Sequence, residues 1–122
     1  MNAKEVRALY YSQTVAALRE LGMDPSLNGF SYCRFLIGLL TERGTMTGLG
    51  ALYAEAAAVF STSPSRVERD VRYAVERTWQ RGRLDAIDRR FGYSVDRERG
   101  KPTNREFVCR MAESVMESMN RA

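Results

Sequence analysis

The chain contains no histidine. Histidine is the commonest general base in enzymes and the commonest metal ligand, so its absence argues against acid–base catalysis and against a metal centre. No serine or cysteine has a visible base partner, which weakens the case for a nucleophilic mechanism. Asp85 and Asp88 are spaced like a catalytic pair, but they lie among arginines and are expected to form surface ion pairs. We therefore expect neither an enzyme nor a cofactor site.

Long apolar runs, proline and cysteine are also scarce. The longest apolar stretch, around 56–60, is preceded by Glu55 and is too short to span a bilayer, and residues 1–7 lack the apolar core of a secretory signal. Only three prolines and a hydrophobic content of 44% fit a folded globular chain. Cys33 and Cys109 lie on apolar helix faces and are expected to be buried, reduced thiols. We expect a cytoplasmic protein that does not enter the membrane.

The spacing of apolar residues is helical from one end of the chain to the other. Large apolar side chains recur every three or four residues in segments separated by turn residues. A length of 122 residues fits one domain, 1–122, with one core. We predict an all-α fold of about six helices in a compact domain, with a brief extended segment at 93–95 and a charged loop at 96–101. The first helix is expected to end near Gly22, and the second to stop at Arg43–Gly44. The third is expected to start after a Thr47 cap, and the fourth to span about 63–81. The fifth should close at Gly92, and the sixth should begin with a Thr103–Glu106 capping box.

The fourth of these helices carries the most informative pattern. Ser63 is placed to cap it, Pro64 suits its first position, and Gly82 is expected to end it in a left-handed conformation. At about 100° per residue, one side is apolar and the opposite side is rich in arginine. The apolar side consists of Val67, Val71, Ala74, Val75 and Thr78, and the opposite side of Arg66, Arg69, Tyr73, Arg77 and Gln80.

The excess of positive over negative charge begins where this helix begins. The net charge is +4; residues 1–62 hold five basic and five acidic side chains, whereas residues 63–110 hold thirteen basic and eight acidic ones. Twelve of the thirteen are arginines, which favour bidentate contacts to bases and phosphates. A helix that buries one side and presents arginines on the other can lie in a DNA major groove, and a short turn before it makes a helix-turn-helix plausible.

Two interpretations of this face stay open at this point. Arg66 and Arg69 lie in the first two turns, where an arginine can bind guanine O6 and N7, and Glu68 can accept from cytosine N4. Alternatively the face is only solvated, with ion pairs four residues apart joining Glu68 to Arg72 and Arg66 to Asp70. Trp79 and Tyr73 are candidate stacking platforms, although Trp79 is more typical of a core.

Four ordered motifs resemble a known family. Residues 65–69 (SRVER), 79–82 (WQRG), 91–93 (FGY) and 101–107 (KPTNREF) resemble the C-terminal DNA-binding domain of stage zero sporulation protein A, a response regulator of sporulation. The resemblance spans nearly the whole chain and is densest from 60 to 107. It implies an all-helical domain in which the third and fourth helices form a helix-turn-helix.

The resemblance also implies partners and roles. Double-stranded DNA with a GTCGAA-like box is the expected ligand, often in tandem copies, with homodimer contact between neighbours left open. Arg66, Glu68 and Arg69 are expected to contact bases, and Lys101 the phosphate backbone. The further residues expected at the backbone are Ser63, Ser65, Tyr73 and Arg77.

Two departures from the family pattern bear on function. No receiver domain precedes the chain, so control by aspartyl phosphorylation is expected to be lost or supplied by a partner, unless the chain is a piece of a longer protein. Ala58 and Val59 stand where family members often have basic residues, which removes phosphate contacts and predicts weaker binding with a shallower salt dependence.

A function of another class is the alternative. A receiverless module could pair with a full-length regulator through the 96–101 loop or through the last helix, where methionine-lined faces repack readily. The methionines concerned are Met111, Met116 and Met119. Nucleic-acid binding without sequence preference is a third possibility.

Overall fold

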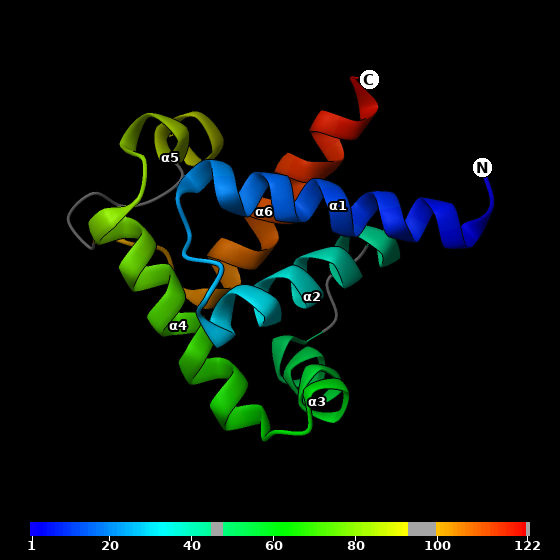
Figure 1. The fold of residues 1–122 in the computed structure, drawn as a ribbon, viewed down its shortest axis with the longest axis horizontal. Helices are drawn as coiled ribbons and strands as arrows, with labels where there is room; N and C mark the ends of the chain where they lie inside the picture. The colour runs from blue at the N-terminus through cyan, green and yellow to red at the C-terminus, as the bar shows by residue number, and fades with distance from the viewer. Residues whose placement is uncertain (45–47, 93–99, 122) are drawn as a thin grey trace.

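The computed structural model describes residues 1–44, 48–92 and 100–121, and all the regular elements in these ranges are helices (Figure 1). The prediction of an all-α fold with six helices is confirmed for this part of the chain. Thr47, the segment 93–95 and most of the charged loop 96–101 lie outside the described residues. The helices are α1 (Ala3–Leu21), α2 (Asn28–Arg43), α3 (Leu49–Phe60), α4 (Pro64–Arg81), α5 (Leu84–Phe91) and α6 (Asn104–Asn120).

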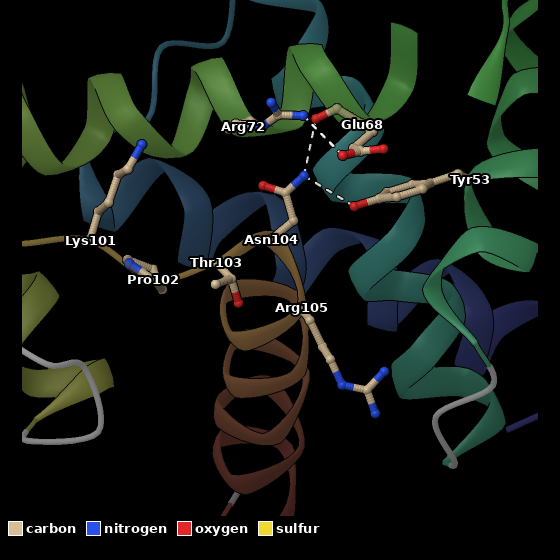
Figure 2. A pocket seen from close by; sticks show the side chains of 8 residues that line it. All are labelled: Tyr53, Glu68, Arg72, Lys101, Pro102, Thr103, Asn104 and Arg105. Atoms are coloured by element: carbon tan, nitrogen blue, oxygen red, sulfur yellow. Dashed lines mark hydrogen bonds and ion pairs between the residues drawn. The ribbon is translucent and has the colours of Figure 1, made fainter. Parts of the chain in front are cut away.

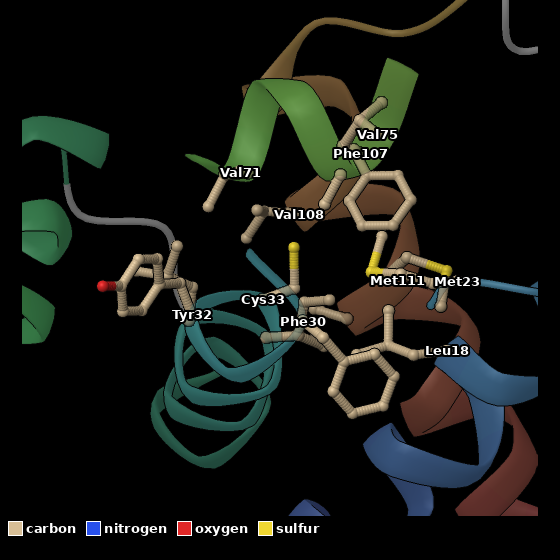
Figure 3. Packing of buried hydrophobic residues seen from close by; sticks show 14 of the residues in the cluster. Leu18, Met23, Phe30, Tyr32, Cys33, Val71, Val75, Phe107, Val108 and Met111 are labelled. Carbon is tan, nitrogen blue, oxygen red and sulfur yellow. The ribbon is translucent and has the colours of Figure 1, made fainter. Parts of the chain in front are cut away.

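Helix α2 lies at the centre of the fold and packs against α1, α3, α4 and α6. It is buried on several sides because apolar residues occupy most of its circumference rather than one stripe. Side chains from α1, α2, α4 and α6 meet around Cys33 and Met111 (Figure 3). Helix α4 therefore packs into one connected core through its apolar side. The residues of that side are all buried, as predicted: Val67, Val71, Ala74, Val75 and Thr78.

Local capping signals fix most helix ends. The Ser63 hydroxyl accepts from the Arg66 backbone N–H at 3.2 Å, with Pro64 at the first position of α4. Thr103 and Glu106 form the predicted capping box of α6. Gly22 ends α1 in the left-handed region at φ 88°. Gly48 is the N-cap residue of α3, and the predicted Thr47 cap lies outside the described residues.

The prediction for Gly82 is wrong in its conformation. Gly82 has φ −78° and ψ −174°, which is extended rather than left-handed. Glycine is needed there for a different reason, because a Cβ would lie 2.5 Å from the Leu21 carbonyl oxygen. That carbonyl accepts from the Arg83 N–H at 2.9 Å, so the end of α4 passes directly over the end of α1.

The two cysteines differ in burial. Cys33 is fully buried, and burial raises the pKa of its thiol to about 12, so it is inert at neutral pH. Cys109 is only partly buried, contrary to the prediction. None of the helices in the described ranges combines the length and apolar character needed to cross a membrane.

Candidate nucleic-acid interface

Helices α3 and α4 pack against each other and are joined by residues 61–63. Ser61 takes a left-handed conformation at φ 54°, and the Thr62 N–H donates a hydrogen bond to the Ala57 carbonyl at 2.9 Å. Together these turn the chain sharply at the end of α3. Ser63 then starts α4, and its hydroxyl lies 3.3 Å from that of Ser65. The first turns of α4 are thus held beside α3 on the outside of the molecule (Figure 1).

The exposed side of α4 carries Arg66, Arg69, Tyr73 and Arg77, which we call the arginine face. Arg66 and Arg69 are exposed, and neither guanidinium has an ion-pair partner among the described residues, so the alternative pair between Arg66 and Asp70 is not formed. The two residues further along are engaged with each other: Arg77 donates to the Tyr73 hydroxyl at 3.2 Å, and its guanidinium carbon lies 5.9 Å from the ring centroid. The front of the face is therefore open for a ligand.

Glu68 does not share this face. Two residues of helix correspond to about 200°, which places Glu68 about 160° around the axis from Arg66. Its carboxylate forms an ion pair with Arg72 at 2.9 Å, as the alternative interpretation predicted. The structure therefore brings Arg66 and Arg69 together as predicted and separates Glu68 from them.

A groove of about 570 Å³ follows the side of α4 that holds Glu68 and Arg72 (Figure 2). Its opposite wall is Tyr53 of α3 and the segment 101–105 that leads into α6. The side-chain amide of Asn104 donates to the Tyr53 hydroxyl and to the Glu68 backbone carbonyl, both at 3.0 Å. Sequence analysis missed this bridge, although Asn104 lies within the motif at 101–107.

Lys101 lies further along the same side of α4. Its ammonium group forms an ion pair with the carboxylate of Glu76, and its side chain is 41% exposed. Glu68, Arg72 and Glu76 follow one another at four-residue spacing, so the segment 101–104 runs beside a single row of α4. The lysine expected at a phosphate is therefore held by a carboxylate in this structure.

Comparison with known protein families identifies the family of this chain. A family model described as the sporulation initiation factor Spo0A C terminal matches residues 14–115 of the 122. The chain belongs to this family. The Spo0A C-terminal domains are DNA-binding effector domains of transcription regulation. The match includes the whole of α2, α3, α4 and α5, and with them the arginine face and the Asn104 bridge.

Helix α3 contributes no cation to this surface of the Spo0A C-terminal domain. Ala58 and Val59 are exposed near its end, and its last turn has no basic residue. Its one charged side chain, Glu55, is paired with Arg43 at 2.7 Å. Of the two helices, only α4 therefore brings positive charge to the α3–α4 connection.

The two candidate stacking residues and the three methionines of α6 divide between the core and the surface. Trp79 is partly buried and packs edge-on against Phe91, with ring centroids 4.9 Å apart, so it belongs to the core. Tyr73 is 48% exposed. In α6, Met111 is fully buried, Met119 packs against the core, and Met116 is 39% exposed.

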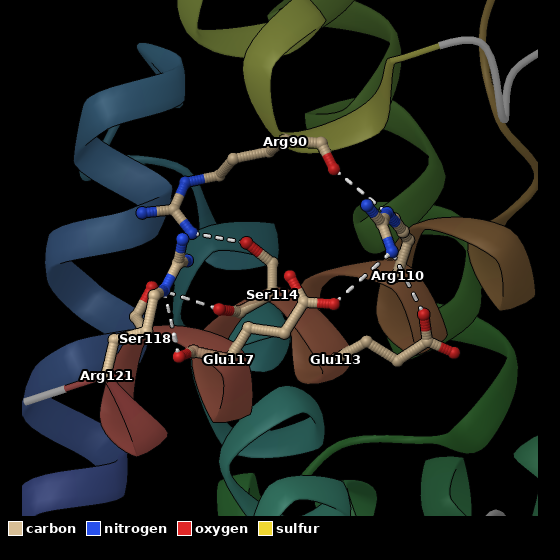
Figure 4. A network of polar contacts seen from close by, with 7 residues as sticks. All are labelled: Arg90, Arg110, Glu113, Ser114, Glu117, Ser118 and Arg121. Atoms are coloured by element: carbon tan, nitrogen blue, oxygen red, sulfur yellow. Dashed lines mark hydrogen bonds and ion pairs between the residues drawn. The ribbon is translucent and has the colours of Figure 1, made fainter.

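A second polar network joins α5 to α1 and α6 (Figure 4). Arg90 donates to the Ser114 hydroxyl at 2.5 Å and to Glu20 at 3.0 Å, and Arg110 donates to the Arg90 carbonyl at 2.9 Å. Asp85 pairs with Arg89 at 3.9 Å, as expected of a surface ion pair. These contacts anchor α5, and they leave the buried Nε of Arg90 without a hydrogen-bond partner in the described part of the chain. In the ranges that the structure describes, no three acidic or cysteine side chains are grouped to hold a metal ion.

Proposed function

We propose that this chain is a cytoplasmic, sequence-specific regulator of transcription that binds double-stranded DNA through a helix-turn-helix formed by α3 and α4. Helix α4 lies in the major groove. The observation that carries the proposal is the pair Arg66 and Arg69, exposed in the first two turns of α4 and without an ion-pair partner among the described residues. An arginine so placed can hold guanine O6 and N7 together.

The remaining residues have supporting roles in this proposal. Ser63, Ser65, Tyr73 and Arg77 flank the two base-contacting arginines and bind the phosphate backbone. Glu68 keeps one carboxylate oxygen, Oε2, for a cytosine amine, because its ion pair with Arg72 uses Oε1. The favoured duplex contains a GTCGAA-like box, the ligand implied by the family pattern.

The test is a titration of labelled duplexes followed by fluorescence anisotropy. The parent protein, Arg66→Ala and Arg69→Ala are each titrated against the box and against a scrambled duplex of equal composition. We expect each variant to raise the Kd for the box by about 5-fold to 150-fold, because one bidentate arginine contact discriminates by about 1–3 kcal/mol. The Kd for the scrambled duplex should change far less.

Arg7→Ala is the matched control. It removes one arginine and an exposed ion pair with Glu42 from α1, near the N-terminus and away from α4 (Figure 1). Its affinity for the box should equal that of the parent. If both α4 variants bind the box as the parent does, the assignment is wrong. A parent protein that binds both duplexes equally tightly binds DNA without sequence preference. A parent protein that shows no preference for the box but binds a full-length regulator is the alternative interaction module.

A further inference from the structure

We propose that Asn104 is a positioning residue: its side-chain amide fixes α4 against α3 and so sets the angle at which Arg66 and Arg69 meet the base pairs. The inference rests on the proposed role of α4 in DNA binding. Asn104 itself belongs to α6 and lies outside the arginine face. It acts through the backbone of α4 and not through a base.

The amide joins a fixed point to a functional one. Tyr53 is only 8% exposed, so its ring is held in place by the core and carries the hydroxyl to the edge of the groove. The Glu68 carbonyl belongs to the same turn of α4 that carries Arg66 and Arg69. An asparagine amide has two N–H donors, and the two contacts of 3.0 Å use them both. Figure 2 shows the amide directed toward both partners.

Asn104 is itself held in position. The capping box of Thr103 and Glu106 fixes the first turn of α6, so the backbone of Asn104 cannot swing freely. Lys101 of the same segment pairs with Glu76, eight residues beyond Glu68 and about 12 Å along the helix. That pair is exposed and contributes little, so the Asn104 bridge, which reaches Tyr53 of α3, is the contact that sets the direction of α4 at the turn with Arg66 and Arg69.

The specificity of a base contact depends on this direction, because a bidentate arginine requires a defined approach to the guanine edge. Phosphate contacts carry no sequence information and depend mainly on charge, which is less directional than a bidentate hydrogen bond. Loss of the bridge should therefore lower the preference for the box and leave binding to other DNA nearly unchanged. A purely structural role would lower both together, in parallel with stability.

Two variants remove the bridge. Asn104→Ala removes both hydrogen bonds, and Tyr53→Phe removes one while keeping the ring in the core. Loss of hydrogen bonds of ordinary strength predicts a fall of about 3-fold to 10-fold in the ratio of the scrambled-duplex Kd to the box Kd. The Kd for the scrambled duplex should stay within about twofold of the parent value on the same grounds.

Two controls separate positioning from stability. Asn2→Ala removes the side-chain cap of α1 and leaves Asn104 and its capping box unchanged, so it should lower the melting temperature while keeping the ratio. Asn120→Ala makes the same substitution as Asn104→Ala at the exposed end of α6 and should change neither. An unchanged ratio in both bridge variants, or an equal fall with Asn2→Ala, would overturn the proposal.

Amide hydrogen exchange in the DNA-free protein separates this proposal from the proposed function. If the parent shows no preference for the box, the proposed function fails, and the exchange of residues 66–72 decides the positioning role. Faster exchange in Asn104→Ala and Tyr53→Phe, but not in Asn120→Ala, supports the bridge as the element that holds α4. Equal protection in all four proteins overturns it.

Discussion

The ammonium group of Lys101 pairs with the Glu76 carboxylate, so any contact between this lysine and a DNA phosphate must replace that ion pair. The exchange is feasible because both side chains are substantially exposed, and exposed pairs contribute little, at about 0–1 kcal/mol. The groove beside α4 leaves room for the side chain to turn.

Lys101→Ala should weaken binding to box and scrambled duplexes by the same factor. It should also reduce the slope of log K against log salt by roughly one unit, since one phosphate contact is lost. Glu76→Gln should act in the opposite direction on affinity, because it frees Lys101. Anisotropy titrations at several salt concentrations measure both effects. Lys4→Ala, which alters the chain's other lysine in the first turn of α1, is the control. A loss confined to the box would contradict a backbone role for Lys101.

At the scale of the helix, α4 is placed by a close crossing with α2. A Cβ on Gly29 would clash with the Asp70 carbonyl oxygen and would lie 2.7 Å from the Ala74 Cβ. Both neighbours belong to α4, one of them is backbone, and neither can move aside alone. The glycine therefore allows the arginine-bearing helix to lie directly on the central helix.

Gly29→Ala should destabilise the protein by about 1–3 kcal/mol, the usual cost of overpacking. Gly50→Ala is the matched control, because a Cβ at Gly50 meets nothing within 4 Å. It should stabilise α3 by about 0.5–1 kcal/mol through the helix preference of alanine over glycine. Urea unfolding followed by circular dichroism measures both. Equal effects of the two substitutions would rule out a close α2–α4 crossing.

The helix ends show which features a sequence can predict. Ser63, Pro64 and the Thr103–Glu106 capping box were predictable because each interaction spans three or four residues. Gly82 was recognised as a helix end but for the wrong reason, because its neighbour, the Leu21 carbonyl, is distant in sequence. Local chemistry determines where a helix ends, and tertiary contacts determine the conformation of that end.

For the molecule as a whole, the excess of positive charge lies in the helices formed by the second half of the sequence. The balanced residues 1–62 form α1, α2 and α3, while the basic residues 63–110 form α4, α5 and the start of α6. Concentrated positive charge raises the rate at which an anionic duplex is encountered, and this effect falls with added salt. The order of the helices therefore keeps the basic excess in α4 and in the elements that follow it.

The candidate site was predictable from sequence only in part. The arginine face follows from the helical period, and its exposure on α4 agrees with that prediction. The helical period also places Glu68 away from Arg66, although the motif at 65–69 led us to group the two as base contacts. The Asn104 bridge and the Lys101–Glu76 pair join residues far apart in the chain, and no local pattern encodes such pairings.

The central claim is that Arg66 and Arg69 on α4 distinguish base pairs. The most direct test measures Kd for the parent, Arg66→Ala and Arg69→Ala against a set of boxes that differ from the parent box by one base pair each. We predict that each variant loses discrimination at one guanine-containing position, by about 1–3 kcal/mol, and keeps it elsewhere. Identical discrimination profiles for the parent and both variants would contradict the claim.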